Sequence, residues 1–306
     1  MATNESGPER VAVIGAGAVG TAIAAALSRG SRFRVTSVHS RTREKAERAA
    51  RLAGGAATVA ESAAAAARDA DVVLVTTPDD AISRVAEALA AASAFRRGAL
   101  VAHCSGALAA SDALRAAKER GARIGSIHPL QSFAGAEPAS ARLDGVLIAC
   151  EGDDDAAADL EAIARDLGGT PFRVKQEDKP LYHAAAALAS NSLVALVSLS
   201  VSLLASLGLE RGRALASLLP LVRGTVENLG ALGLPRALTG PIARGDVDTA
   251  RKHAGALSSR APAALPAYLA LAEETIAVAR EKGTLSAEAE RGIRGLLARL
   301  SSAAAR

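Results

Sequence analysis

Three glycines near the start of the chain separate an apolar run at 10–14 from a second apolar run at 21–27. Their G-x-G-x-x-G spacing is typical of the turn that leads from a strand into a helix in dinucleotide-binding units. The first glycine permits the tight turn, the second lets the backbone approach a pyrophosphate, and the third allows close helix–strand packing. The first helix amides then face the phosphate charge. We therefore predict a dinucleotide site formed by Gly15, Gly17, Ala18, Val19 and Gly20.

The second expected strand, at 33–38, ends without the carboxylate that binds the ribose hydroxyls in NAD-preferring sites. Arg41 and Arg43 can instead pair with a 2′-phosphate, and Ser40 and Thr42 can donate hydrogen bonds to it. The alternative is a solvated helix start, with Ser40 or Thr42 as its N-cap. The missing acid favours NADP(H) over NAD.

Apolar strand candidates alternate with helical stretches up to about residue 176, and the remainder is helical almost throughout. This order predicts an α/β fold, in which a mostly parallel sheet is flanked by helices, followed by an all-α domain. We expect a Rossmann NADP-binding domain at 1–176 and a helical substrate and dimerisation domain at 177–306. The further strands are expected at 71–78, 99–103, 122–128, 145–150 and 171–174.

The net charge of +4 is mild and is not interleaved with aromatic residues, which form only 2% of the 306-residue chain. Nucleic-acid binding is therefore not indicated, whereas a small anionic substrate and an anionic cofactor suit this charge. The polar stretch at 1–9 has no signal-peptide core, so we expect a cytoplasmic protein. Cys104 and Cys150 suggest neither a disulfide framework nor a metal site. A residue such as Cys104 is more often a small buried hydrophobic group than a nucleophile.

The stretch 184–209 carries no charged residue and is long enough to span a bilayer. It contains Asn191 and six serines, however, and it lacks aromatic belts. A long helix buried inside a helical domain or a dimer explains it better than a membrane span.

Polar groups follow several of the expected strands. Since ligands bind beyond the carboxyl ends of an open α/β sheet, these loops are predicted to form the walls of the site. The groups expected there are Thr76, Thr77, Pro78, His103, Cys104, Ser105 and His128.

Hydride transfer to a carbonyl or imine needs a proton donor or acceptor, an orienting group and usually a cation for the substrate carboxylate. His128 stands at a strand end, and His183 and Asn191 lie eight residues apart in one expected helix. Arg244 lies in a Gly/Pro-rich turn before Asp246, an expected helix N-cap. Structural roles remain the alternative: a histidine bonded to a loop carbonyl, an interhelical bond that fixes register, or an arginine paired with a surface aspartate.

The glycine turn, His-Cys-Ser-Gly at 103–106, His-Pro-Leu-Gln-Ser-Phe at 128–133, Leu-Tyr-His at 181–183 and Gly-Pro-Ile-Ala-Arg-Gly-Asp at 240–246 occur together. This set resembles the bacterial family of Rossmann-like proteins that carry the domain of unknown function 2520. The family is similar in plan to pyrroline-5-carboxylate reductase, ketopantoate reductase and the 6-phosphogluconate dehydrogenase group. The resemblance implies an N-terminal NADP domain, a helical C-terminal domain and a homodimer formed through the latter.

Two relatives suggest roles for individual residues. Asn191 matches the Asn of hydroxyacid dehydrogenases, but Ala187 stands where their catalytic lysine would be, which leaves His183 as the nearby substitute. His128 and Ser105 look like the His-Pro histidine and the serine of prephenate dehydrogenases. The resemblance leaves the acid–base assignment open between the two histidines.

These observations together predict an NADPH-dependent reductase, or the reverse dehydrogenase, that acts on a small carboxylate-bearing oxo or imino compound. His128 or His183 would exchange the proton, Asn191 and Ser105 would hold the reacting group, and Arg244 would bind the carboxylate. A prephenate-type dehydrogenase and a non-catalytic NADP-binding regulator are the alternatives.

Overall fold

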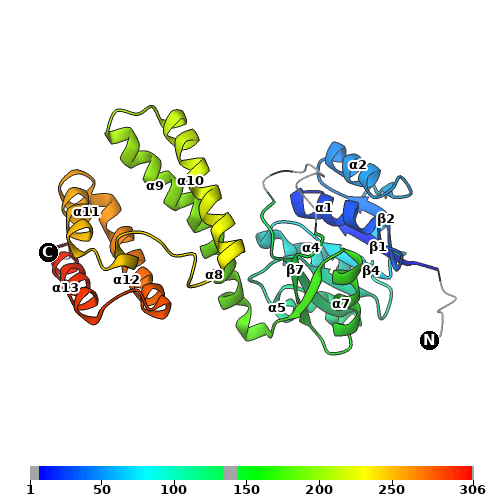
Figure 1. The fold of residues 1–306 in the computed structure, drawn as a ribbon. Coiled ribbons are helices and arrows are strands. Elements are labelled where there is room, and N and C mark those ends of the chain that lie inside the picture. Colours follow the sequence, from blue (N-terminus) through cyan, green and yellow to red (C-terminus); the bar gives the residue numbers. More distant parts are fainter. Residues whose placement is uncertain (1–6, 134, 136–142, 305–306) are drawn as a thin grey trace. The chain divides into compact units, whose positions relative to one another are not determined.

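The computed structural model describes residues 7–133, 135 and 143–304. The chain divides into two compact units, which comprise residues 1–191 and 192–306 (Figure 1). The first unit contains a β-sheet with its covering helices, and the second is helical. The predicted fold class, a Rossmann domain followed by an all-α region, is confirmed.

An eight-stranded sheet forms the centre of the first unit, in the order β3-β2-β1-β4-β5-β6-β7-β8. Neighbouring strands from β3 to β6 are parallel, whereas β7 runs antiparallel to β6 and parallel to β8. The central strands are continuous apolar runs because helices cover both faces of the sheet. The strands are β1 (Glu9–Ile14), β2 (Phe33–His39), β3 (Thr58–Val59), β4 (Val72–Val75), β5 (Leu100–His103), β6 (Arg123–Pro129), β7 (Leu147–Gly152) and β8 (Thr170–Arg173).

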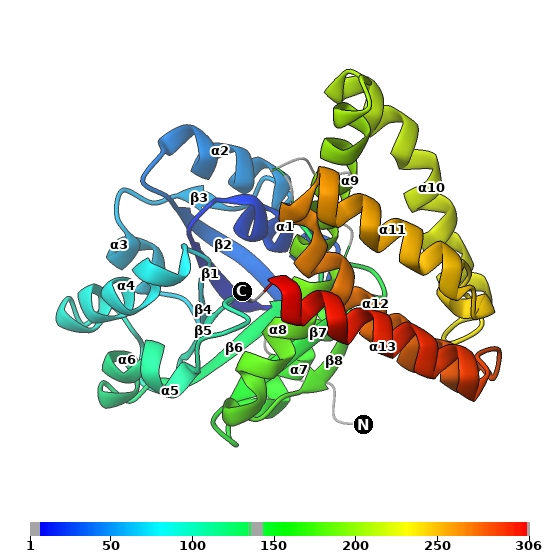
Figure 2. The same ribbon diagram turned by 90° about the vertical axis from the view of Figure 1, so that its left-hand side faces the viewer.

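Two hydrophobic clusters lie on the two faces of this sheet. One contains Ile23, Leu27 and Leu160, and it packs α1 (Ala18–Leu27), α2 (Arg43–Leu52) and α7 (Ala157–Asp166) against the strands. The other contains Ile82 and Leu89 and covers the opposite face, where Figure 2 shows its helices to the left of the sheet. These helices are α3 (Ala63–Ala67), α4 (Asp79–Ala91), α5 (Ala110–Ala113) and α6 (Arg115–Glu119).

The second unit has its own apolar core, which includes Ile242, Ile276 and Ile293. The carboxylate of Asp246 accepts a hydrogen bond of 2.9 Å from the amide of Thr249, so the expected N-cap is confirmed. The elements of this region are α9 (Asn191–Ser206), α10 (Arg211–Leu232), η3 (Ile242–Arg244), α11 (Val247–Arg260), η4 (Pro262–Ala264), α12 (Leu265–Lys282) and α13 (Ala287–Ala304).

The expected single helix through His183 and Asn191 is wrong. Helix α8 (Lys179–Ala189) ends before Ser190, whose φ of −114° and ψ of −71° depart from regular helical values although its amide still donates to the Ala186 carbonyl, and α9 begins at Asn191. The two polar residues therefore belong to two successive helices. The predicted domain boundary at 176/177 falls where the sheet region passes into η2 (Gln176–Asp178), whereas α8 groups with the sheet unit.

The segment 176–206 is long and apolar enough to cross a membrane, with a mean hydropathy of 1.8, and a single such segment is weak support for a membrane span. Only 6% of its apolar stretch is buried. The expected burial inside a helical domain is therefore not found within the described chain, where Lys179 is the buried residue of α8 and Val201 that of α9.

Candidate functional site

A cleft of about 580 Å³ lies at the carboxyl ends of β1, β2 and β4. Eight of the predicted cofactor residues line it, whereas Ala18, Val19 and Gly20 lie beside it in the first turn of α1. The predicted residues in its walls are Gly15, Gly17, Ser40, Arg41, Thr42, Thr76, Thr77 and Pro78.

The glycine turn has the geometry that close approach requires. Gly15 has a φ of +110°, and a Cβ on Gly20 would lie 2.0 Å from the Gly15 carbonyl oxygen. No described atom lies within 4 Å of the position of a Cβ on Gly17, which borders the cleft. The first turn of α1 has no acidic residue, so its free amides favour a negatively charged ligand.

Two threonines at the end of β4 differ in what their hydroxyl groups do. The hydroxyl of Thr76 donates to the Gly15 carbonyl oxygen at 2.5 Å and holds the turn. The hydroxyl of Thr77 is buried and has no hydrogen-bond partner among the described residues. Because buried polar groups are normally paired, the Thr77 hydroxyl fits a cleft that takes up a polar ligand.

The far end of the cleft is rich in positive charge. Arg41 forms no ion pair within the described part of the chain, whereas Arg43 pairs with Glu47 at 2.9 Å and does not line the cleft. The sequence interpretation missed two further lining cations, Lys45 and Arg84, of which Arg84 pairs with Asp80 in the same wall. Lys45 lies in the first turn of α2, close to Arg41 in the sequence, which could have revealed it. This charge suits a phosphate-bearing ribose.

A buried network of charged and polar groups lies near the ends of β5 and β6, and the sequence interpretation missed it too. The ammonium of Lys179 donates to the Ser126 hydroxyl at 2.5 Å and to the Ser105 carbonyl at 3.2 Å. It also lies 3.3 Å from a carboxylate oxygen of Glu151. Burial lowers the pKa of Lys179, and the Glu151 charge opposes that shift. The three donors of the ammonium are therefore used within the protein.

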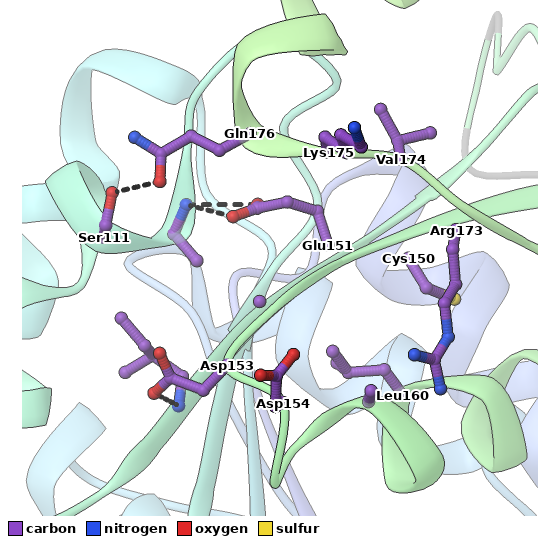
Figure 3. A pocket seen from close by; sticks show the side chains of 14 residues that line it. Ser111, Cys150, Glu151, Asp153, Asp154, Leu160, Arg173, Val174, Lys175 and Gln176 are labelled. Atoms are coloured by element: carbon purple, nitrogen blue, oxygen red, sulfur yellow. Dashed lines mark hydrogen bonds between the residues drawn. The ribbon is translucent and has the colours of Figure 1, made fainter.

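Glu151 connects this network to a second cavity, of about 440 Å³, drawn in Figure 3. Its carboxylate accepts hydrogen bonds from the Ala110 amide at 3.1 and 3.3 Å, and so holds the start of α5. Two charged groups of the wall are paired, Asp153 with Lys118 and Arg173 with Glu161. Glu151 thus forms part of both the cavity wall and the buried network.

The hydroxyl of Ser105 is already engaged. It donates to an Asp79 carboxylate oxygen at 2.7 Å and accepts from the amides of Ala107 and Leu108 at 3.2 and 3.1 Å. Holding a substrate group would require this arrangement to open, so the predicted role of Ser105 stays a prediction.

The two candidate proton-exchanging histidines lie close together. The imidazole centres of His128 and His183 are 5.8 Å apart and their planes are nearly perpendicular. A Cβ on Gly106 would lie 2.9 Å from Nε2 of His128 and 2.6 Å from Nδ1 of His183. The two nitrogens therefore converge on Gly106, which the sequence interpretation did not single out. His183 is exposed, whereas His128 is partly buried.

Burial determines the protonation of several groups at the strand ends. Burial, with help from the charges of His183 and Lys179, lowers the pKa of His128 to about 4. Burial likewise lowers the pKa of His103 to about 3. It raises the pKa values of Cys104 and Cys150 to about 12, which keeps both thiols protonated and speaks against a nucleophilic cysteine.

The remaining predicted site residues are both exposed. Asn191 opens α9, and Arg244 ends η3 in the second unit. Within the described residues Arg244 forms no close ion pair with Asp246 or Asp248, since Asp248 pairs with Arg251 and Asp246 caps α11, although the Arg244 charge helps to lower the pKa of Asp246. The substrate roles of Asn191 and Arg244 stay predictions.

Comparison with known proteins assigns both parts of the chain to domain families. The Rossmann-like domain matches residues 5–129, and the domain of unknown function DUF2520 matches residues 146–275. A sequence search of curated proteins gave no match.

Three solved structures illustrate the similarity. A Bacteroides fragilis protein named as a candidate NADP oxidoreductase is 25% identical, with a TM-score of 0.69 over 88% of this chain and 98% of that one. A Thermotoga maritima protein is 26% identical, with a TM-score of 0.69 over 89% and 99%. The reductive aminase of Aspergillus terreus in complex with NADPH and ethyl levulinate shares the fold at 20% identity, with a TM-score of 0.55 over 96% and 94%.

The order of the domains, the glycine turn and the two family matches agree with one another. The chain belongs to the family of Rossmann-like proteins with a C-terminal DUF2520 domain and has the architecture of NADP-dependent oxidoreductases.

Proposed function

We propose that this protein is an NADP(H)-dependent oxidoreductase that transfers a hydride to or from a small carboxylate-bearing oxo or imino compound. The observation that carries the proposal is the cleft at the glycine turn, in which Arg41 has no ion-pair partner among the described residues and the Thr77 hydroxyl is unpaired. The free amides of α1 would bind the pyrophosphate, and Arg41, Lys45 and the hydroxyls of Ser40 and Thr42 would bind the 2′-phosphate.

When it is bound, the nicotinamide supplies or accepts the hydride. The protein then has to move one proton and hold the substrate. His128 or His183 exchanges the proton, Asn191 orients the reacting group, and Arg244 binds the carboxylate. Ser105 contributes to orientation if its bond to Asp79 opens.

Relatives support this choice without defining the substrate. The reductive aminase named above binds NADPH, and the Bacteroides fragilis protein is named for NADP-linked redox chemistry. The candidate histidines, His128 near the end of β6 and His183 in α8, suit proton transfer to a carbonyl or imine. The carboxylate in the substrate is inferred from Arg244, which can bind it in a charge-assisted pair.

Titration of the purified full chain with NADPH, followed by a panel of oxo acids, cyclic imines and their reduced counterparts, tests the proposal. We expect saturable NADPH binding and oxidation of NADPH by at least one oxo or imino acid. Turnover of NADP+ with prephenate alone would favour the prephenate-type dehydrogenase. Binding of NADPH without turnover of any compound would favour the non-catalytic regulator, and no saturable binding at millimolar NADPH would overturn the cofactor assignment.

We also propose that the protein acts in the cytoplasm as a homodimer formed through its helical region. Helices α9 and α10 expose several large apolar side chains that the described chain leaves uncovered. An exposed apolar surface of this kind is typical of a protein interface. A second copy of the same chain would cover it through an isologous contact. The exposed side chains are Leu193, Val194, Leu215, Leu219, Leu221, Val226, Leu229 and Leu232.

A further inference from the structure

Tyr182, in α8, is a partly buried hydrogen-bond partner of His128. Its hydroxyl oxygen lies 2.9 Å from Nδ1 of His128 and donates to the main-chain carbonyl oxygen of His128 at 3.3 Å. The two rings meet edge to face, with centres 5.5 Å apart. Burial raises the pKa of Tyr182 to about 12, so the phenol keeps its proton and remains a donor at neutral pH.

These two contacts can be satisfied together in only one way. A phenol has one proton, and a neutral imidazole has one N–H and one bare nitrogen. If the Tyr182 proton goes to the carbonyl, the phenol oxygen is free to accept from an N–H at Nδ1 of His128. If the proton goes to Nδ1 instead, the contact with the carbonyl has no hydrogen. The complete arrangement therefore places the imidazole proton on Nδ1 and leaves Nε2 bare.

The bare nitrogen is on the side where the two histidines converge. Nε2 of His128 is the atom that faces Gly106, beside Nδ1 of His183. The charged and titratable groups that face His128 are Lys179 and His183 on α8, Asp79 at the start of α4, and His103 on β5. These surroundings leave one nitrogen with a lone pair directed away from Tyr182.

We propose that Tyr182 is a positioning residue that fixes His128 as the Nδ1–H tautomer, so that Nε2 of His128, and not a nitrogen of His183, exchanges the proton with the substrate. The inference rests on the proposed function. In the oxidising direction, Nε2 accepts the proton of the substrate hydroxyl or amino group while the hydride leaves its carbon for the nicotinamide. In the reducing direction, Nε2 first takes up a proton from solvent, and the imidazolium then gives that proton to the carbonyl oxygen or imine nitrogen as the hydride reaches the substrate carbon.

The chain contains its own references for a spectroscopic test. The amide of Ser105 donates to Nδ1 of His103 at 3.1 Å, so His103 carries its proton on Nε2. Nδ1 of His39 lies 3.1 Å from the Ala60 carbonyl oxygen, so His39 carries its proton on Nδ1. Nitrogen-15 NMR of histidine-labelled full-length protein separates the two tautomers, and single His→Gln variants assign the signals.

In the wild-type protein at pH 7, we expect the ring nitrogen-15 chemical shifts of His128 to match those of His39, which carries its proton on Nδ1. Tyr182→Phe should convert His128 to a mixture of tautomers, lower kcat about 10-fold or more and leave NADPH affinity unchanged, because tautomer control is lost while the imidazole stays in place. Tyr268→Phe is the matched control, since the Tyr268 hydroxyl lies 3.5 Å from Nδ1 of His253. It should leave kcat and the His128 signal as they are.

The two histidine variants complete the test. His128→Gln should lower kcat at least 100-fold, whereas His183→Gln should keep more than a tenth of it. Three results would each overturn the inference. They are a wild-type His128 signal that matches His103, an unchanged His128 tautomer in Tyr182→Phe, and a larger loss of kcat in His183→Gln than in His128→Gln. If the wild-type protein turns over no compound, the proposed function fails, and the tautomer is still read in the same sample, so the two failures are distinguishable. Thermal melts of each variant identify loss of folding.

Discussion

The ammonium of Lys179 lies 3.3 Å from the carboxylate of Glu151, and both side chains are more than nine-tenths buried. Lys179 stands in the first turn of α8, and Glu151 stands in β7 beside the start of α5. The pair therefore connects the starts of α5 and α8 to strand β7. Removing one partner leaves an uncompensated buried charge, which is far more costly than losing an exposed ion pair.

Lys179→Met should lower the free energy of unfolding of the sheet unit by about 3–5 kcal/mol, because the Glu151 carboxylate stays buried without its counter-ion. Urea denaturation followed by circular dichroism measures the change. Lys118→Met is the matched control, because it removes an ion pair with Asp153 in which the lysine is half exposed, and should cost about 0–1 kcal/mol. Equal losses in the two variants would contradict the structural role of the Lys179–Glu151 pair.

Gly106→Ala should lower kcat on the order of 100-fold while NADPH affinity is kept, since small displacements of catalytic groups have effects of this size. The added Cβ would lie 2.6 Å from Nδ1 of His183 and 2.9 Å from Nε2 of His128, so at least one imidazole must move. Steady-state kinetics and fluorescence titration of NADPH measure the two quantities. Gly255→Ala in α11 is the control, because no described atom lies within 4 Å of its new Cβ. Full activity of Gly106→Ala would show that the site tolerates the displacement.

Local pattern was enough to predict the fold class and most strands, because a buried strand such as Val72–Val75 is an uninterrupted apolar run between turns. The two-residue strand Thr58–Val59 is too short to show a period, and the antiparallel direction of β7 leaves no local mark in the sequence. The break at Ser190 was missed since neither Gly nor Pro signals it.

The candidate site was predictable only in part for a related reason. The glycine turn, Arg41 and Thr77 follow three strands that are recognisable in the sequence, and the carboxyl ends of parallel strands meet at one edge of the sheet, so their proximity was predictable. Lys179 and Glu151 are far apart in the chain, and their pairing depends on the order and register of the strands. The partnership of Tyr182 with His128 likewise forms only when α8 packs on the end of β6.

Arg41→Ala should weaken NADPH binding roughly 10- to 150-fold, because a charge-assisted hydrogen bond contributes about 1.5–3 kcal/mol. NADH affinity should change little, since NADH lacks the 2′-phosphate. Isothermal titration with both nucleotides measures the ratio. Arg43→Ala is the matched control, because Arg43 pairs with Glu47 and does not line the cleft. Equal losses for the two nucleotides would remove the phosphate assignment of Arg41.

The free energy of unfolding should decrease as the pH falls from about 6.5 towards 4. The pKa values of His103 and His128 are about 3 and about 4 in the folded protein, below the ordinary 6.5, because burial disfavours the charged form. The unfolded chain therefore binds more protons in this window, which destabilises the folded state by up to about 1.4 kcal/mol per pH unit for each histidine.

Urea denaturation at several pH values measures this slope. Between pH 6.5 and 5, where carboxyl groups contribute less, His103→Gln should make the slope shallower. It removes up to about one proton from the difference in bound protons between the unfolded and the folded state. His128→Gln gives a second, independent comparison. A slope that both variants leave unchanged would show that neither histidine is held neutral by the fold.

Leu221→Lys should shift the protein from dimer to monomer, because the substitution puts a charge into the apolar surface proposed to meet a second copy. Sedimentation velocity at several protein concentrations measures the mass. Leu130→Lys is the control, since Leu130 is also exposed but lies after β6 in the first unit. A wild-type protein that sediments as a monomer at every concentration would contradict the proposed homodimer.

One helical turn separates Lys179, fixed to the sheet, from His183 at the proposed site of proton exchange, with Tyr182 between them. Each residue added to or removed from 180–181 would rotate everything that follows by about 100° around the helix axis. The rings of Tyr182 and His183 would then point away from β6, although neither residue had been substituted. Length within this turn should consequently be under stricter constraint than residue identity, and a single-codon deletion here should be more damaging than most substitutions.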